Sequence, residues 1–270
     1  MRASRSDLKR WFGWLSLVVA FSIACVYLSN WQFNRREEAL TAMQQLAENY
    51  DSPAVQLQDV ANLDSFDKSN EWRRVELSGR YLVDKSVLVR NRPLNGQPGF
   101  LQVVPFELSD GTVVAVERGW LAAGDQYQAP DDVPLPAESI QTITGRTRAS
   151  EPTLNRTAPQ GQLATINIAA LVAAESIEQK VFSKVYVRMA SESLVQETAP
   201  KRLDKPQLGE GNHLSYALQW ILFALMSAAA LFWGIKKERE AQAGKKRISK
   251  RKLFGQVDAE TEDKLLDRSS

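Results

Sequence analysis

Residues 212–235 read NHLSYALQWILFALMSAAALFWGI, an apolar stretch that opens at the only histidine of the chain, His213. The 22 residues from Leu214 to Ile235 carry no charge, and as a helix rising about 1.5 Å per residue they would span roughly 33 Å. The hydrocarbon core of a bilayer is roughly 30 Å thick. The stretch therefore predicts a transmembrane helix over 213–235.

A second apolar stretch lies near the N-terminus. Trp11 to Leu28 gives 18 residues without a charge, which as a helix would span about 27 Å, enough for a slightly tilted or thinned fit. A signal peptide would have a shorter apolar core and an Ala-x-Ala-like cleavage site, and the following sequence, YLSNWQFNRREEA, offers none. We predict an uncleaved membrane helix over 11–28, which Glu37 to Leu46 continue outward.

Basic residues gather at the outer ends of both predicted helices, which marks those ends as cytoplasmic. Arg35 and Arg36 argue weakly the other way, but a long domain translocates largely regardless of its charge. Because the chain opens without a mitochondrial type of presequence, we expect a bacterial cytoplasmic (inner) membrane. The predicted parts are a cytoplasmic N-terminus, a helix, a periplasmic domain, a helix and a cytoplasmic tail, over residues 1–10, 11–28, 29–212, 213–235 and 236–270.

Charge and cysteine usage exclude several classes of function. The basic run Lys236 to Lys252 is accounted for by anionic headgroups beside a membrane helix, so it gives little support to nucleic-acid binding. Cys25, the only cysteine, lies in the first predicted helix, so the exterior domain has no disulfide and no Cys/His copper or zinc site. Without a histidine base or a thiol there, we expect no enzyme and no catalytic residues, although composition leaves a Ser-Lys dyad open.

The exterior domain is expected to be mostly strands. Six runs are rich in β-branched residues and partly alternate, namely 73–83, 86–92, 99–108, 112–121, 139–148 and 181–189. Turns at Asp84-Lys85, Asn95-Gly96 and Asp110-Gly111 separate successive runs and favour antiparallel hairpins. One helix is predicted near Ile168 to Glu175, and Ala199 to Gly211 reads as a flexible lead. The predicted fold class is two transmembrane α-helices flanking a mainly antiparallel β (α+β) extracytoplasmic domain.

Four segments carry a resemblance to a known family: YLSNWQFNRREEAL (27–40), VLVRNRPLNGQPGF (87–100), VVPFELSDGTVVAVERGWL (103–121) and GNHLSYALQWILFAL (211–225). Together with the two-helix layout they resemble the Surfeit-locus-1 family of membrane-anchored assembly factors. This chain has Ser29 where that family often has glycine, and residues 154–168 match only loosely. The resemblance implies a chaperone-like factor for haem-copper cytochrome c oxidase, concerned with inserting or stabilising haem a in the largest oxidase subunit. It also implies contact with the enzymes that make haem a.

The start of the second helix offers a candidate haem contact. With about 100° of rotation per residue, His213, Tyr216 and Trp220 share one helix face, against which a flat porphyrin could lie. His213 would supply the axial nitrogen and Trp220 would pack on the ring or its apolar tail. The resemblance points to the same His213 and Trp220. The alternative is an interfacial belt, since these residue types are enriched where a helix meets headgroups.

The end of the first helix should lie at the same membrane depth. Trp31 and Gln32 are therefore candidates to close the other side of a pocket, although Trp31 also suits an interfacial belt. Arg35 is a candidate partner for a haem propionate, because a guanidinium binds a carboxylate with two parallel hydrogen bonds. Contact with a lipid headgroup explains Arg35 equally well.

Other residues stand out in the strand-like runs, namely Arg90, Asn91, Arg92, Gly99, Arg118, Gly119 and Trp120. We interpret them as residues that end strands, pair with carboxylates and pack turns, in preference to binding a partner. The glycines are expected to serve backbone geometry.

The number of histidines available as haem ligands favours a protein that delivers haem over one that transfers electrons. A monomer with one histidine cannot bind haem through two, and a singly ligated haem can leave without a large barrier. The sequence leaves open whether haem a, b or o is the cargo, and whether two copies present two His213 rings to one haem. A purely structural scaffold that grips an oxidase subunit without cofactor is the alternative function.

Overall fold

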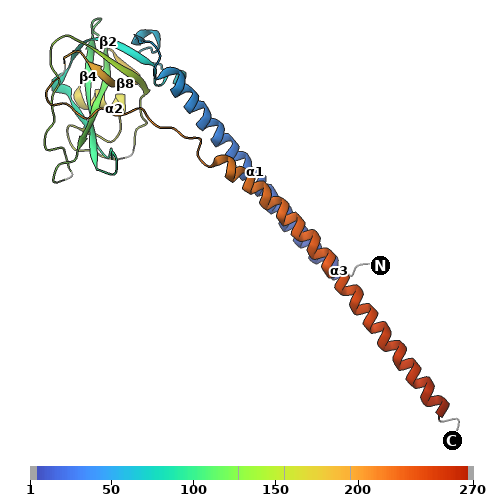
Figure 1. The fold of residues 1–270 in the computed structure, drawn as a ribbon. Coiled ribbons are helices and arrows are strands. Elements are labelled where there is room, and N and C mark those ends of the chain that lie inside the picture. The colour runs from blue at the N-terminus through green and yellow to red at the C-terminus, as the bar shows by residue number, and fades with distance from the viewer. Residues whose placement is uncertain (1–4, 127, 155, 195, 267–270) are drawn as a thin grey trace. The chain divides into compact units, whose positions relative to one another are not determined.

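The computed structural model describes residues 5–126, 128–154, 156–194 and 196–266 (Figure 1). Of the predicted cytoplasmic ends, residues 1–4 and 267–270 lie outside the described residues, as do the side chains of the basic residues from 245 onward. The chain divides into two compact units. The first comprises the residues up to Leu40 together with those from Glu210 onward, and we call it the helix pair. The second, Thr41–Gly209, is called the sheet unit.

Two long helices dominate the ends of the chain. Helix α1 covers Arg5–Asn49 and helix α3 covers His213–Leu266. Over Lys9–Asn49 and His213–Ala241 they are long and apolar enough, by length and composition, to cross a membrane. The expected outward continuation of the first helix is confirmed. Helix α3 begins at His213 as predicted but continues beyond Ile235, because the residues that follow are mostly Lys, Arg, Glu, Ala and Gln, which favour helix.

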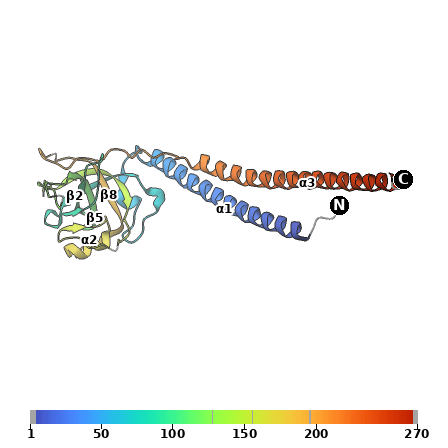
Figure 2. The same cartoon turned by 90° about the horizontal axis from the view of Figure 1, so that it is seen from below.

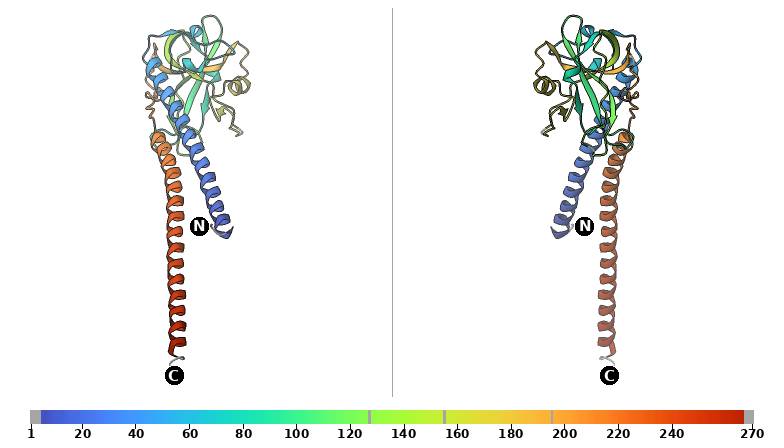
Figure 3. Two further views of the ribbon diagram at one scale, coloured as in Figure 1. Left: turned by 90° about the vertical axis from the view of Figure 1, so that its right-hand side faces the viewer. Right: turned by 90° about the vertical axis from the view of Figure 1, so that its left-hand side faces the viewer.

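The helix pair is antiparallel, because residues progressively earlier in α1 contact residues progressively later in α3. Gln32 meets His213, Ser29 meets Ala217 and Trp11 meets Glu238. Figure 3 shows the two helices running along each other, and Figure 2 shows them separating toward the N-terminal end of α1. Small buried residues line the close part of the seam: Cys25, Ser29 and Ala217 are almost fully buried. Such residues let helix backbones approach closely.

Ser29, which departs from the glycine of the resembled family, is accommodated in this seam. Its hydroxyl donates a 3.1 Å hydrogen bond to the backbone oxygen of Ala217 on the other helix. A hydroxyl that bonds a carbonyl leaves no unsatisfied polar group in an apolar setting. The Ser29 hydroxyl therefore adds a polar link between the two helices.

The described residues of the sheet unit form eight strands: β1 (Val55–Gln56), β2 (Arg74–Tyr81), β3 (Val87–Val89), β4 (Gly99–Leu108), β5 (Val113–Ala122), β6 (Gln141–Ala149), β7 (Gln162–Leu163) and β8 (Val181–Glu192). They pair in the order β1-β2-β6-β8-β5-β4-β3-β7, and β2 also pairs with β4. The five long strands, β2, β6, β8, β5 and β4, therefore close into a ring, which we call the barrel. All six predicted runs are strands; the two-residue β1 and β7 were not predicted from the sequence, being too short for a pattern to show.

One expectation about pairing needs correction. The turn at Asp84-Lys85 does not form a hairpin: Val83–Lys85 is a 3₁₀ turn, and β2 pairs with β4 and β6 and not with β3. The amide of Leu82, just after β2, bonds to the oxygen of Pro105 in β4. The other two hairpins are confirmed, with Gly96 and Gly111 in the left-handed region at φ +80°. The sheet is mainly antiparallel but includes three parallel pairs, β5–β8, β1–β2 and β3–β7.

Strands β4 and β5 are buried on both faces, which explains their nearly continuous apolar sequence. Val104 and Phe106 point to the cluster inside the barrel, whereas Leu101 and Val103 point to a second cluster that includes helix α2 (Ile168–Glu175). The predicted helix is thus confirmed. It begins after Asn167, whose side chain accepts a 2.9 Å hydrogen bond from the amide of Ala170.

The segment that precedes α3, Ala199 to Gly211, is bonded to the sheet at Lys201. Lys201 exchanges two backbone hydrogen bonds with Trp120, at 2.7 and 2.8 Å, so the predicted flexible lead is tied to β5 there. Gly119 makes this possible: a Cβ on it would lie 2.6 Å from the oxygen of Lys201. At Gly99 a Cβ would clash with the Trp120 ring. Both glycines serve backbone approach, as expected.

Candidate functional site

The candidate site centres on His213, the first residue of α3, which is half-buried. Its Nδ1 atom lies 2.9 Å from Oε1 of Gln32 on α1. An amide oxygen only accepts hydrogen bonds, so Nδ1 of His213 carries the hydrogen and donates it. In the neutral ring, Nε2 is then the nitrogen with a free lone pair. A hydrogen bond of this kind is how proteins orient an imidazole that ligates a metal.

The free edge of the ring lies over Gly211. This glycine has φ +69°, and a Cβ built on it would lie 3.3 Å from both Nε2 and Cδ2 of His213. Any side chain at this position would crowd the nitrogen that Gln32 leaves free. The left-handed backbone also disfavours other residues at position 211. Glycine therefore avoids this crowding and turns the chain into the helix.

A second polar contact joins α1 to the segment just before His213. Arg36, one turn after Gln32 on α1, forms an ion pair with Glu210, and both side chains are about one-third exposed. The structure thus places Arg36, and not Arg35, against the segment that precedes α3. Arg35 bonds Glu38 on its own helix at 2.8 Å. The proposed contact of Arg35 with a propionate stays a prediction.

The predicted aromatic residues occupy different positions. Trp220 is half-buried on the same helix row as His213 and Ala217, with its ring edge-on to Phe223 at 5.8 Å. Tyr216 and Trp31 are about half exposed. From about 100° of rotation per residue in antiparallel helices, Trp31 and Arg35 flank the same side of the seam as Tyr216.

An apolar groove follows this same side of the helix pair. Its lining includes Trp14 and Leu17 of α1 with Ala230 and Gly234 of α3. A comparable groove, about 580 Å³, lies on the opposite side. The helices therefore present His213 and Gln32 at one end of the pair and apolar grooves farther along it. A flat amphipathic ligand with one coordinating centre and an apolar tail matches this distribution of polar and apolar surface.

Sequence reasoning placed Gln32 at the depth of His213 but did not assign it to the ring. Glu210, Gly211 and Arg36 were missed. The signal available was the spacing of Gln32 and Arg36, four residues apart and so on one helix face. Their partners lie more than 170 residues away in the chain, at positions whose register the sequence pattern does not specify.

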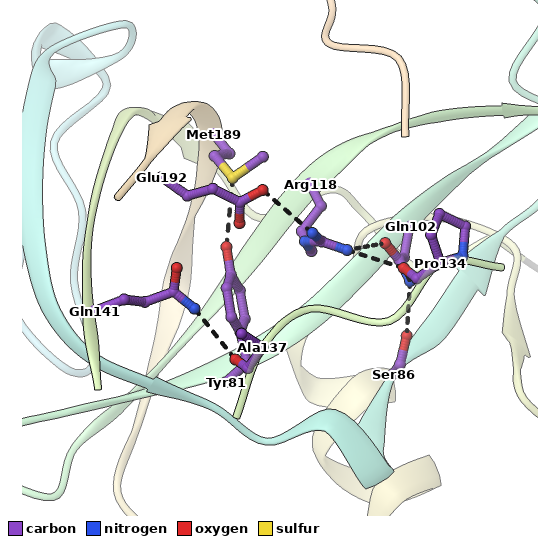
Figure 4. Close-up of polar contacts among 9 residues, drawn as sticks. All are labelled: Tyr81, Ser86, Gln102, Arg118, Pro134, Ala137, Gln141, Met189 and Glu192. Carbon is purple, nitrogen blue, oxygen red and sulfur yellow. Dashed lines mark hydrogen bonds and ion pairs between the residues drawn. The ribbon is translucent and has the colours of Figure 1, made fainter. Parts of the chain in front are cut away.

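A separate group of polar side chains is buried at one end of the barrel (Figure 4). Arg118 is fully buried; it donates to Gln102 Oε1 and to the Pro134 carbonyl, each at 2.9 Å, and pairs with Glu192 at 3.3 Å. Tyr81 lies beside them with its hydroxyl 3.4 Å from the sulfur of Met189, and burial raises the pKa of that hydroxyl. Because its charges are paired, we assign this group a structural role: it holds the segment around Pro134 on the barrel. Arg118 thus pairs with a carboxylate, as the sequence predicted.

One family model and several known proteins are similar to this chain. The model described as the SURF1 family matches residues 19–225. A SURF1-like protein of Mycobacterium tuberculosis (strain ATCC 25618 / H37Rv) is 31% identical over 246 residues, which cover 86% of this chain and 88% of that protein. A SURF1-like protein of Rickettsia bellii is 26% identical over 143 residues, 51% of this chain and 56% of the relative. The cytochrome oxidase assembly protein SHY1 of Saccharomyces cerevisiae is 29% identical over 118 residues, 43% of this chain and 30% of that protein.

Proposed function

This chain belongs to the SURF1 family, and from that membership we propose that it is a membrane-anchored assembly factor for cytochrome c oxidase. The name of the yeast relative, a cytochrome oxidase assembly protein, supports this role. The role needs no catalysis by the chain itself. It implies contact with oxidase components, among which we propose the largest subunit, and with the enzymes that make haem a.

The proposed setting is a bacterial inner membrane crossed by α1 and α3. Two helices of sufficient length and hydropathy support membrane anchoring. The basic residues at both outer ends support cytoplasmic termini, which would place the sheet unit in the periplasm. In this arrangement His213 and Gln32 would lie near the periplasmic face of the bilayer.

We further propose that the helix pair holds haem a transiently through Nε2 of His213. The residues fit such a group: the ring is oriented from its other nitrogen, and Gly211 adds no side chain beside Nε2. Trp220, Tyr216 and Trp31 would pack on the macrocycle or its tail, and Arg35 would meet a propionate. When bound, the haem would contribute an iron that accepts one axial nitrogen from this chain.

One ligand per copy suits a holder that must release its cargo. His213 is the only histidine in the 270 residues, so a second imidazole would have to come from a second copy. A monomer would hold the haem through His213 alone, which would ease its transfer to a receiving protein. A homodimer that presents two His213 rings to one haem would instead give the spectrum of a bis-histidine haem.

The observation that carries the haem proposal is the 2.9 Å contact between Gln32 Oε1 and His213 Nδ1. We would purify the full chain in detergent after co-expression with the enzymes that make haem a. A Soret band present in the wild type and lost or shifted in His213→Ala supports ligation. Ser215→Ala, an exposed residue two positions along the same turn, is the matched control and should leave the band unchanged.

The same experiment separates the proposal from its alternative. A colourless wild type, or identical spectra for wild type and His213→Ala, would overturn the haem role. If His213→Ala also supported normal oxidase assembly in cells, the chain would act as a scaffold that grips an oxidase intermediate without cofactor. Retained assembly with a lost Soret band would separate the two roles within one protein.

A further inference from the structure

A polar hollow of about 770 Å³ lies in the sheet unit. Three segments form it: the residues after β3, the residues after β6, and the residues after β7. Its lining includes the side chains of Arg90, Arg92, Glu151, Arg156, Thr157 and Thr165. The lining is thus rich in hydrogen-bond donors, with three guanidinium groups and one carboxylate.

The one carboxylate of the lining, that of Glu151, already has hydrogen-bond partners. Glu151 accepts two hydrogen bonds from Arg92, one of them at 3.1 Å to Oε1, and another at 2.9 Å from the amide of Ile166. Although burial opposes ionisation, the bonds from Arg92 and Ile166 lower the pKa of Glu151 below its ordinary value. Glu151 is therefore ionised at neutral pH, and it neutralises Arg92.

Within the described part of the chain, neither of the other two arginines has such a partner. The Nε atom of Arg90 is buried without a hydrogen-bond partner, while its backbone is held by a 3.0 Å bond to the oxygen of Leu163. Arg156 is exposed, and no ion pair joins either arginine to a carboxylate among the described residues. A buried guanidinium nitrogen without a partner is costly, and such groups call for an explanation.

The backbone between the first two arginines turns at Asn91. Its φ of +58° lies in the left-handed region, which asparagine adopts more readily than most residues other than glycine. Both neighbours, Arg90 and Arg92, line the hollow. This turn is held by the Arg92–Glu151 pair and by the 2.9 Å bond from the amide of Arg92 to the oxygen of Gly99.

We propose that this hollow binds a dianionic oxyanion ligand, with Arg90 and Arg156 as its charged donors and the two threonine hydroxyls as neutral ones. Three arginines and one ionised glutamate leave a lining charge of +2, which two negative charges would balance. Guanidinium groups bind carboxylate and phosphate oxygens with paired, charge-assisted hydrogen bonds. The chemistry is shared by a phosphate group and by two neighbouring carboxylates. It does not depend on haem binding by the helix pair.

The test uses the full chain in detergent at constant ionic strength, with inorganic phosphate and a short Glu-rich peptide as probes. Saturable binding is expected by calorimetry, and Arg90→Gln and Arg156→Gln should each weaken it roughly tenfold or more, as expected for losing charged hydrogen bonds. Arg202→Gln, which removes one charge from an exposed position outside the hollow, is the control and should bind like the wild type.

The two probes distinguish the sources of the ligand. Tighter binding of the peptide would identify the acidic side chains of a protein as the ligand, and tighter binding of phosphate would identify a phosphate compound. Absence of saturable binding by both probes would overturn the proposal. So would equal binding by wild type, Arg90→Gln and Arg156→Gln. Arg92→Gln is not informative here, because it would leave the buried Glu151 without its partner.

Discussion

Gln32 and His213 join the two ends of the chain: the amide oxygen of Gln32 on α1 lies 2.9 Å from Nδ1 of His213 on α3, 181 residues later. The contact has two consequences. The hydrogen bond at Nδ1 orients the imidazole, and it sets the tautomer in which Nε2 has a free lone pair that a metal could use. It also makes the ring orientation depend on the register between two helices, so the ligand position and the helix pair are physically coupled.

We expect Gln32→Leu to weaken haem binding by about 10–100-fold, the usual effect of removing a group that orients a metal ligand. Gln32→Glu keeps an acceptor at the same place and should bind nearly as well as wild type. Haem titration followed at the Soret band measures both. Equal affinity of the Leu variant and the wild type would show that Gln32 does not orient the ring.

Gly211→Ala should reduce haem binding, because the added Cβ would lie 3.3 Å from Nε2 of His213 at a backbone of φ +69°. The backbone penalty alone is about 1–2 kcal/mol. Gly209→Ala is the matched control, since a Cβ there meets nothing within 4 Å. The same haem titration distinguishes them. If both variants bound haem equally, the open edge of the ring would not be where the ligand approaches.

Breaking the buried ion pair of the barrel should strongly destabilise the sheet unit. Arg118→Met leaves Glu192 buried without its partner, a change that costs about 3–5 kcal/mol. Arg80→Met removes one partner of the Arg80–Glu107 pair, in which Arg80 is 59% exposed, and should cost less than about 1 kcal/mol. Unfolding followed by tryptophan fluorescence compares the two. A similar loss in both would mean that the burial of Arg118 contributes little.

Glu151 should make the stability of the sheet unit depend on pH. Its folded pKa lies below its ordinary value of 4.5, so its contribution is present above pH 4.5 and is lost as the pH falls through the lowered value. Thermal unfolding of wild type and Glu151→Gln from pH 7 to pH 3 tests this: the variant is less stable at pH 7, and the difference shrinks on acidification. Glu76→Gln, at an exposed position on β2, is the control. A difference that stayed constant down to pH 3 would contradict the assignment.

Much of the architecture follows from local patterns in the chain. The apolar runs at 11–28 and 213–235 predict α1 and α3 because helix length and hydropathy are properties of contiguous residues. The six long or central strands follow from β-branched residues and alternation, and α2 from its own short pattern. Arg92 and Arg118 pair with carboxylates as expected, although the sequence does not identify Glu151 and Glu192 as the partners.

By itself, then, the sequence determined where the two long helices, α2 and the six longer strands lie, that the chain has one imidazole, and which family it resembles. Only the tertiary structure decided which strands close the barrel, that β5 and β8 run parallel, and that Gln32 meets His213. It also decided that Arg90 lines a hollow with an unpartnered nitrogen. The reason is physical: periodicity reports a residue's own helix or strand, whereas partners, register and burial arise when segments far apart in the chain pack together.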